Sequence, residues 1–399
     1  MTKRTILQVV PRLEAGGSEQ AAIEIADALV QAGARALVAT EGGRMATALA
    51  EAGGEILPLP VASKNPLAIL ANARRLARAV NDHKVDLLHA RSRAPAWSAL
   101  LAARRTRKPF VTTYHGSYAS PGPFKNWYNS VMARGDVVIA NSQFTAKLIM
   151  ARHKLPRERI RVIYRGVDMS RFSLDQVSEN RTGRLRALWG IGREQPVVIQ
   201  AARLTAWKGQ TLVIEAAHRL LAEGRLGDAV IVMAGDAQGR GAYQKELEKL
   251  IRRLGVVDRV KLVGHCDDMP AAFALARAAV IASTSAETFG RTSIEAQAMG
   301  CPVIVSAIGA APETVVAEGA HFTGWTVPAN DANAIAERIA AALALTQEER
   351  AAIGWRARRN VAGKFTLQRM QRATLAVYDE LLATQLANRF DAYRSPHLP

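Results

Sequence analysis

Two glutamates with a glycine between them are the first residues whose types and spacing suggest chemistry. Glu287 and Glu295 stand eight positions apart in ETFGRTSIEAQAMGCPVIV, residues 287–305. On one helix, eight residues give about 12 Å of rise and about 80° of rotation, a poor fit to the roughly 5–10 Å between paired glycosidase carboxylates. Gly290 favours a helix that begins near Thr292 and leaves Glu287 in the preceding loop. The two carboxylates can then hold the two ends of a long ligand, a sugar and a ribose, with the helix N-terminus at the phosphates between them.

Glu295 also has a purely structural explanation. Thr292 and Glu295 have the spacing of a capping box, in which an N-cap residue contributes about 1 kcal/mol. Considered alone, this pattern favours a structural role for Glu295. Glu287 precedes the box and gains little from capping, so it is the better candidate for chemistry.

Two cations follow an apolar run in QAARLTAWKGQ, residues 200–210. Arg203 and Lys208 stand on one predicted loop after a strand, and Gly209 opens the next helix. Arg can grip a diphosphate with its planar fork and Lys with its point charge, so this loop is a candidate diphosphate site. A solvated loop with two basic residues is the ordinary alternative in so basic a chain.

A pair of glycines, Gly16 and Gly17, leads into the first predicted helix. Bare N–H groups at a helix N-terminus suit a phosphate, although a turn that needs glycine only for its dihedral angles explains the pair equally well. The loop PRLEAGGSEQ (11–20) is not G-x-G-x-x-G, and no G-x-x-x-x-G-K-[ST] occurs. A dinucleotide dehydrogenase and a P-loop protein are therefore disfavoured.

Short apolar runs alternate with amphipathic stretches of helical length throughout the chain. The predicted strands are 5–10, 36–40, 55–59, 86–90, 109–115, 136–141 and 159–164, then 196–202, 229–235, 260–265, 278–284 and 302–307. Such patterns are typical of doubly wound parallel sheets, here two Rossmann-like α/β domains with a ligand cleft between them. We place the domains at 1–172 and 196–365, with the polar stretch 173–195 as the linker.

The charge is concentrated in the first half of the chain. Of a formal net charge of +18, residues 1–175 hold 26 Lys and Arg against 13 Asp and Glu. This half is expected to meet nucleic acid, anionic lipid or an acidic acceptor. Two cysteines, Cys266 and Cys301, fit a reduced, cytoplasmic setting. No apolar run reaches the ~20 residues of a membrane span, so any membrane association is expected to be peripheral.

The motifs together resemble the retaining glycosyltransferases of family four. They are R-x4-K at 203–208, E-x7-E at 287–295 and the glycine pair at 16–17. The resemblance runs over essentially the whole chain and implies the GT-B fold, with the helix at 366–385 crossing back to the first domain. The stretch 287–306 is most similar to bacterial enzymes that extend the lipopolysaccharide core, including mannosyltransferases that use GDP-mannose.

The resemblance implies a role for each matching residue. Arg203 and Lys208 neutralise the nucleotide diphosphate, Glu287 holds hydroxyls of the donor sugar, and Glu295 holds those of the ribose. His115, in TYHGS, matches a histidine near the reacting carbon. Five further positions are implied to bind the donor through their backbone or by close approach: Gly16, Gly17, Phe289, Gly290 and Arg291. One departure is Ala310, where many members have a second glycine.

The chain has no Asp-x-Asp motif, with which many sugar transferases hold a metal–diphosphate. We therefore expect no metal cofactor, and fixed cations with helix N–H groups to stabilise the departing phosphate. No carboxylate is an evident nucleophile, so the expected retaining mechanism is front-face attack.

The predicted function is transfer of a hexose, with GDP-mannose as the expected donor, to a lipopolysaccharide core or related acidic glycolipid or oligosaccharide. The expected place is the inner face of the cytoplasmic membrane, with an anionic membrane surface as a partner and no nucleic acid. The alternatives are another GT-B enzyme, such as a glucosyl- or N-acetylglucosaminyltransferase or a nucleotide-sugar epimerase, and a polyanion-binding protein.

The stretch PFKNWYNSVMARG, residues 123–135, predicts a helix with one apolar stripe. The stripe consists of Phe124, Trp127, Tyr128, Val131 and Met132. Core packing is the ordinary explanation of such a stripe, and contact with a membrane or with the acceptor is the alternative.

Overall fold

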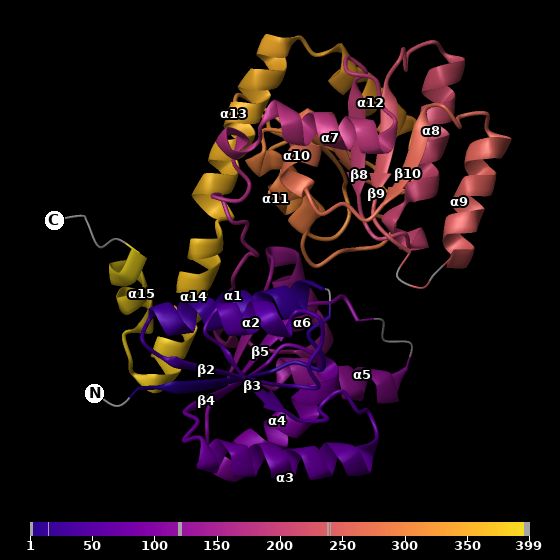
Figure 1. Ribbon diagram of the computed structural model, residues 1–399. Coiled ribbons are helices and arrows are strands. Elements are labelled where there is room, and N and C mark those ends of the chain that lie inside the picture. The colour runs from indigo at the N-terminus through magenta and orange to yellow at the C-terminus, as the bar shows by residue number, and fades with distance from the viewer. Residues whose placement is uncertain (1–2, 15, 119–121, 238, 240, 395–399) are drawn as a thin grey trace. The chain divides into compact units, whose positions relative to one another are not determined.

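The computed structural model describes residues 3–14, 16–118, 122–237, 239 and 241–394. The chain divides into two compact units (Figure 1). Unit 1 comprises residues 1–164 and 367–399, and unit 2 comprises residues 165–366.

The described part of unit 1 holds a parallel sheet of seven strands, in the order β3-β2-β1-β4-β5-β6-β7. The strands are β1 (Thr5–Val9), β2 (Arg35–Thr40), β3 (Glu55–Pro58), β4 (Leu87–Ala90), β5 (Phe110–Tyr114), β6 (Val137–Ala140) and β7 (Ile160–Val162). Strand order reverses between β1 and β4, which is where open α/β sheets bind ligands at their carboxyl edge.

Helices cover both faces of this sheet, because alternate strand residues point to opposite sides. They are α1 (Gly17–Gln31), α2 (Ala46–Glu51), α3 (Pro66–Asp82), α4 (Arg93–Thr106), α5 (Pro123–Asn129), α6 (Gln143–His153), α14 (Leu367–Leu382) and α15 (Leu386–Arg394). Leu7 packs in the core under α3 and α4, whereas Ile6 packs in the core shared with α1 and α14. Figure 1 shows α3 and α4 on one side of the sheet and α1 on the other.

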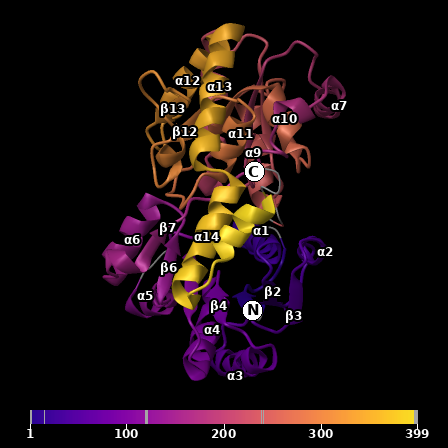
Figure 2. The same ribbon diagram turned by 90° about the vertical axis from the view of Figure 1, so that its left-hand side faces the viewer.

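The helix predicted to return to the first domain is α14, which belongs to unit 1 (Figure 2). Buried hydrogen bonds fix it there. His89 Nδ1 hydrogen-bonds with the Tyr378 hydroxyl at 2.6 Å, and His89 Nε2 hydrogen-bonds with Thr113 Oγ1 at 2.7 Å. Burial lowers the pKa of His89 well below its ordinary value and raises the pKa of Tyr378 to about 12. Both groups therefore stay neutral near pH 7, and the contact between β4, β5 and α14 needs no buried charge on either side chain.

The described part of unit 2 holds a second parallel sheet, of six strands in the order β10-β9-β8-β11-β12-β13. The strands are β8 (Val197–Ala201), β9 (Val230–Ala234), β10 (Val260–Gly264), β11 (Ala276–Ile281), β12 (Val303–Ser306) and β13 (Gly324–Val327). The sequence patterns identified the first five and missed β13, a four-residue edge strand in which Trp325 and Thr326 are only half-buried. Strand order reverses between β8 and β11.

The helices of unit 2 are α7 (Glu179–Trp189), α8 (Gln210–Ala222), α9 (Gly241–Arg253), α10 (Met269–Leu275), α11 (Arg291–Ala298), α12 (Ala332–Ala344) and α13 (Gln347–Lys364). Side chains of α8, α9 and α12 form one core with β8, β9 and β12. Helix α13 packs against α11 and ends at residue 364, just before the chain returns to unit 1.

The stretch 173–195, which we expected to be a linker, contains helix α7 and belongs to unit 2. Its polar composition reflects an exposed helix: Leu185 and Trp189 are buried, and Arg181 Nε donates to Asp268 Oδ2 of α10's N-cap at 2.8 Å. The boundary between the units instead falls between residues 164 and 165.

The stripe at 123–135 divides between the two interpretations. Helix α5 ends at Asn129, and a 3-10 turn carries Val131 and Met132 into the core. Phe124 and Trp127, by contrast, are 78% and 52% exposed. The second half of the stripe is thus core, and the first half is a surface feature.

Candidate functional site

In unit 2 the loops that follow β8 and β11 carry the residues singled out from the sequence. They flank the switch point, the place where the strand order reverses. Arg203 and Lys208 follow β8, and Glu287 follows β11. Because β8 and β11 are parallel neighbours, their carboxyl ends meet at one edge of the sheet. Residues that are 79 positions apart therefore come into contact.

Lys208 and Glu287 form an ion pair at this edge. Lys208 Nζ donates to Glu287 Oε2 at 2.7 Å, and the two side chains are 15% and 13% exposed. Ser283 Oγ donates to the other carboxylate oxygen, Oε1. Lys208 Nζ also lies 4.4 Å from the centre of the Trp207 ring. A lysine and a carboxylate are thus held close together and partly shielded from water, where charges act more strongly on a ligand than at an exposed surface.

The loop between β8 and α8 is held by buried amides. Gln200 Nε2 donates to the Lys208 carbonyl at 2.8 Å, and Gln210 Nε2 donates to the Arg203 carbonyl at 2.9 Å. Gly209 has a φ of +72°, and a Cβ there would lie 2.0 Å from the Ala282 carbonyl oxygen. The position of Lys208 therefore depends on a glycine that follows it. Arg203 is exposed on the same loop.

Helix α11 begins beside this ion pair. Its N-cap is Gly290, and Thr292 Oγ1 contacts the Ala201 carbonyl at the end of β8 at 3.4 Å. The helix starts at Arg291, one residue before the predicted position, so Thr292 is not an N-cap. The capping box is therefore not formed, and the structural explanation that we favoured for Glu295 alone was wrong.

The Glu295 carboxylate instead accepts a hydrogen bond from Arg291 Nε at 2.8 Å. The two residues form an i,i+4 ion pair along α11, with exposures of 30% and 18% for Arg291 and Glu295. Phe289 has a different environment, because its side chain is buried and its ring lies 6.0 Å from that of Phe365. Any role of Phe289 toward a ligand is thus left to its backbone.

The loop after β12 holds Glu287 from the other side. The Ala310 N–H donates to the Glu287 carbonyl at 2.9 Å. Gly309 has a φ of +66°, and a Cβ there would lie 2.5 Å from the same carbonyl oxygen. Ala310 is fully buried and has a φ of −91°, which any residue can adopt, so this position accepts a side chain.

The remaining predicted residues lie at the carboxyl edge of the sheet of unit 1. Gly16 is the N-cap of α1, Gly17 is its first residue, and His115 follows β5. Two residues near the switch points were not singled out from the sequence: Ser283, and Arg91, which follows β4 and is buried with its Nε donating to Gln8 Oε1 at 2.6 Å. A polar residue at the carboxyl end of an apolar run was the available signal for both.

Within the described ranges, no group of three or more His, Cys, Asp or Glu residues is arranged to hold a metal ion. In the same ranges no helix has the length and apolar character needed to cross a membrane.

Comparison with known proteins identifies the family of both units. Residues 15–171 match Glycosyltransferase Family 4, and residues 183–360 match Glycosyl transferases group 1. A D-inositol 3-phosphate glycosyltransferase from Xylanimonas cellulosilytica is 28% identical over 83% of this chain and 84% of its own. A GDP-mannose-dependent alpha-(1-6)-phosphatidylinositol monomannoside mannosyltransferase from Mycolicibacterium smegmatis is 28% identical over 67% of this chain and 71% of its own.

Solved structures give the same result. A glycosyltransferase from Rickettsia africae is 33% identical, with a TM-score of 0.88 over 96% of this chain and all of its own. The Anabaena protein HepE in complex with UDP is 26% identical, with a TM-score of 0.81 over 95% of this chain and all of its own. The chain belongs to the GT-B glycosyltransferases, which confirms the predicted fold and family and disfavours the polyanion-binding alternative.

The glycines of the site differ in what the fold requires of them, and substitution separates them. Gly209→Ala should lower the free energy of unfolding by more than about 1 kcal/mol, because alanine is strained at positive φ and its Cβ meets a carbonyl. Gly290 has a φ of −102°, and the nearest atom to an added Cβ is 3.6 Å away. Gly290→Ala should therefore stay within about 0.5 kcal/mol of the unchanged protein. Urea denaturation measures the free energy of unfolding of both variants. Equal losses of stability would contradict the conclusion that the fold requires glycine at 209 but not at 290.

Proposed function

We propose that this glycosyltransferase moves a hexose from a nucleotide-diphosphate sugar to an acidic glycolipid or oligosaccharide acceptor, such as a lipopolysaccharide core. The observation that carries the proposal is the shielded Lys208–Glu287 ion pair beside the N-terminus of α11. It offers a cation and helix N–H groups to a diphosphate and a carboxylate to sugar hydroxyls within one small region.

In this proposal the donor separates the Lys208–Glu287 ion pair, and each side chain then contacts a different part of the donor. The diphosphate takes Lys208 and Arg203 as its cations. Glu287 Oε1 stays bonded to Ser283, and Oε2, released by Lys208, accepts hydrogen bonds from the sugar hydroxyls. Glu295 binds the ribose hydroxyls, which requires that its ion pair with Arg291 leaves one carboxylate oxygen available. The backbone at Gly290 admits the close approach of the donor, because it carries no Cβ.

We propose GDP-mannose as the donor, with the mannosyltransferase relative as the supporting likeness. A UDP-sugar is the second candidate, and the UDP bound by Anabaena HepE favours it. Lys208 and Arg203 address the diphosphate, which both donors share. The two donors are therefore distinguished by contacts to the base and to the sugar hydroxyls.

The donor is identified by thermal unfolding in the presence of chelator and of GDP-mannose, UDP-glucose, UDP-N-acetylglucosamine or UDP-galactose. A ligand that binds the folded state at 100 times its dissociation constant adds about 2.7 kcal/mol, so the true donor should raise the melting temperature. Stabilisation by GDP-mannose alone supports the mannosyl assignment. Stabilisation by a UDP-sugar alone would contradict it, and a shift that needs added magnesium would contradict metal independence.

Lys208→Ala or Arg203→Ala should lower turnover with the identified donor roughly 10²–10³-fold, because each removes a preorganised cation at the leaving phosphate. The matched control is Lys249→Ala, an exposed lysine on α9. Circular dichroism checks that all three variants are folded. Turnover near that of the unchanged protein in either site variant would remove the assignment, and product of inverted anomeric configuration by NMR would remove the retaining mechanism.

We further propose that unit 1 docks peripherally on an anionic membrane through the face formed by α3, α4 and α5. These helices are contiguous, since Ser98 Oγ donates to the Ile69 carbonyl at 3.0 Å and the Trp97 and Trp127 rings stack at 4.6 Å. The face carries exposed apolar and cationic side chains: Leu67, Leu70, Phe124 and Trp127, with Arg74, Arg75, Arg78, Arg104, Arg105 and Arg107. Each basic residue near an anionic surface contributes about 1 kcal/mol, enough for peripheral binding.

Replacement of the exposed aromatics tests this docking. Phe124→Ala and Trp127→Ala should each reduce co-sedimentation with phosphatidylglycerol vesicles several-fold, because they remove the apolar groups that enter the headgroup region. Leu188→Ala, at a residue 77% exposed on α7, is the control. Equal vesicle binding by all variants would leave these aromatics with a role in packing or acceptor binding only.

A further inference from the structure

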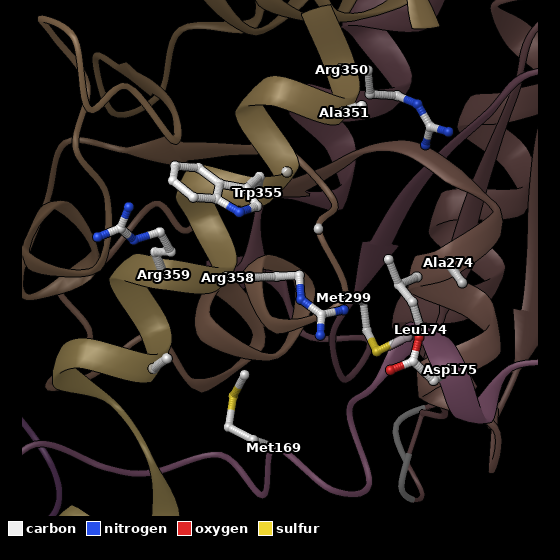
Figure 3. A pocket seen from close by; sticks show the side chains of 13 residues that line it. Met169, Leu174, Asp175, Ala274, Met299, Arg350, Ala351, Trp355, Arg358 and Arg359 are labelled. Atoms are coloured by element: carbon white, nitrogen blue, oxygen red, sulfur yellow. The ribbon is translucent and has the colours of Figure 1, made fainter. Parts of the chain in front are cut away.

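Unit 2 contains a cavity of about 670 Å³ (Figure 3). The described residues that line it include none from the two loops of the candidate donor site. Its lining includes Met299 and Gly300, which follow the last turn of α11. The Lys208–Glu287 pair lies near the first turn of that eight-residue helix, about 12 Å along its axis. The cavity volume is within the usual range for small-molecule sites, roughly 300–1,000 Å³.

The cavity is built by the close approach of α13 to the end of α11. Gly300 ends the helix with a φ of +67°, and Gly354 of α13 packs against it. A Cβ on Gly354 would lie 2.6 Å from the Gly300 carbonyl oxygen, so only glycine permits this spacing. The other wall is formed by Met169, Leu174 and Ala274.

The polar groups of the cavity are mainly cationic. Arg358 is half-buried, and Figure 3 shows its guanidinium pointing into the space between α13 and Asp175. Among the described residues, Arg358 forms no hydrogen bond or ion pair. Arg350 also lines the cavity, and its buried Nε has no partner in the same set. Arg350 Nη1 donates to the Ala276 carbonyl at 3.4 Å, and Figure 3 shows its guanidinium well apart from that of Arg358. The half-buried guanidinium of Arg358 is therefore the group that points to an anion as the ligand.

The electrostatic surroundings of Arg350 also favour an anion. Burial, and then the positive charge of Arg277, lower the pKa of Arg350 from its ordinary value. Both effects mean that its positive charge is held at a cost, which a bound anion would offset. A structural salt bridge would have supplied a carboxylate here, but Asp175, the acidic residue of the described lining, forms no ion pair with either arginine.

Apolar and hydroxyl-binding groups accompany the arginines. Trp355 is 59% exposed at the rim, and Arg359 Cζ lies 4.5 Å from the centre of its ring. Aromatic faces pack against the C–H face of a sugar ring, and a carboxylate such as Asp175 accepts hydrogen bonds from its hydroxyls. The combination suits a ligand with one phosphate and one polyhydroxylated part.

We propose that this cavity binds the phosphate ester of a sugar or polyol, with Arg358 on the phosphate, Asp175 on hydroxyls and Trp355 against the carbon frame, while Arg350 adds positive charge to the same cavity. The ester is either a free metabolite or the headgroup of a phospholipid, since both present the same chemistry. The site is separate from the donor site and does not depend on the proposed donor.

Calorimetric titration of the full-length protein with glucose 6-phosphate and glycerol 3-phosphate, and co-sedimentation with phosphatidylglycerol vesicles, test the proposal. At least one probe should bind, and Arg358→Gln should weaken its binding about tenfold or more, the expected effect of losing a charge-assisted hydrogen bond. Binding of a soluble probe identifies a free metabolite as the ligand. Loss confined to the vesicles identifies a lipid headgroup.

Two matched variants serve as controls. Arg338→Gln removes the same charge from an exposed position on α12 and should leave binding unchanged. Lys208→Ala alters the candidate donor site and should also leave it unchanged. Trp355→Ala, at an exposed side chain, provides a second test and should weaken binding of the sugar phosphate more than that of inorganic phosphate. Binding of no probe, or equal binding by Arg358→Gln and the unchanged protein, would overturn the proposal.

Discussion

Parallel strands that send all their carboxyl ends to one edge are the constraint on which the site of unit 2 depends. The sheet order brings β8 and β11 together at the point where the strand order reverses, so the two loops there cannot avoid each other. Lys208 and Glu287 meet at 2.7 Å for this reason. The topology brings the two loops together, and the types of the two side chains make the contact an ion pair.

The ion pair has a cost as well as a benefit. Two charges that are each about 15% exposed or less lose part of their hydration, and their attraction roughly repays that loss. Such a pair adds little to stability, so stability alone does not explain it. A pair held this way keeps a cation and a carboxylate preformed at one edge, where neither has to be desolvated anew when a charged ligand arrives.

The sequence predicted most of this arrangement, and the failures have physical causes. Apolar runs located β8 and β11 to within two or three residues, and residue type identified Lys208 and Glu287 on their loops. The contact between them was beyond the sequence patterns, because it depends on strand order. Thr292 and Glu295 had capping-box spacing, but Gly290 became the N-cap in place of Thr292, and Arg291 took the carboxylate. Helix α7 was missed because a surface helix can be as polar as a linker.

The glycines of the site show most directly what the structure adds to the sequence. Only the structure separates a glycine that the fold requires from one that it does not. Gly209 and Gly309 both have positive φ and both would place a Cβ against a carbonyl oxygen, so the fold alone accounts for them. Gly290 has neither property, although it stands at the N-terminus of α11 beside Glu287. In a sequence the three are indistinguishable. Since the protein's own atoms leave room for a side chain at Gly290, the reason for a glycine there is best sought in something that approaches from outside, which is what a donor diphosphate at that helix N-terminus would do.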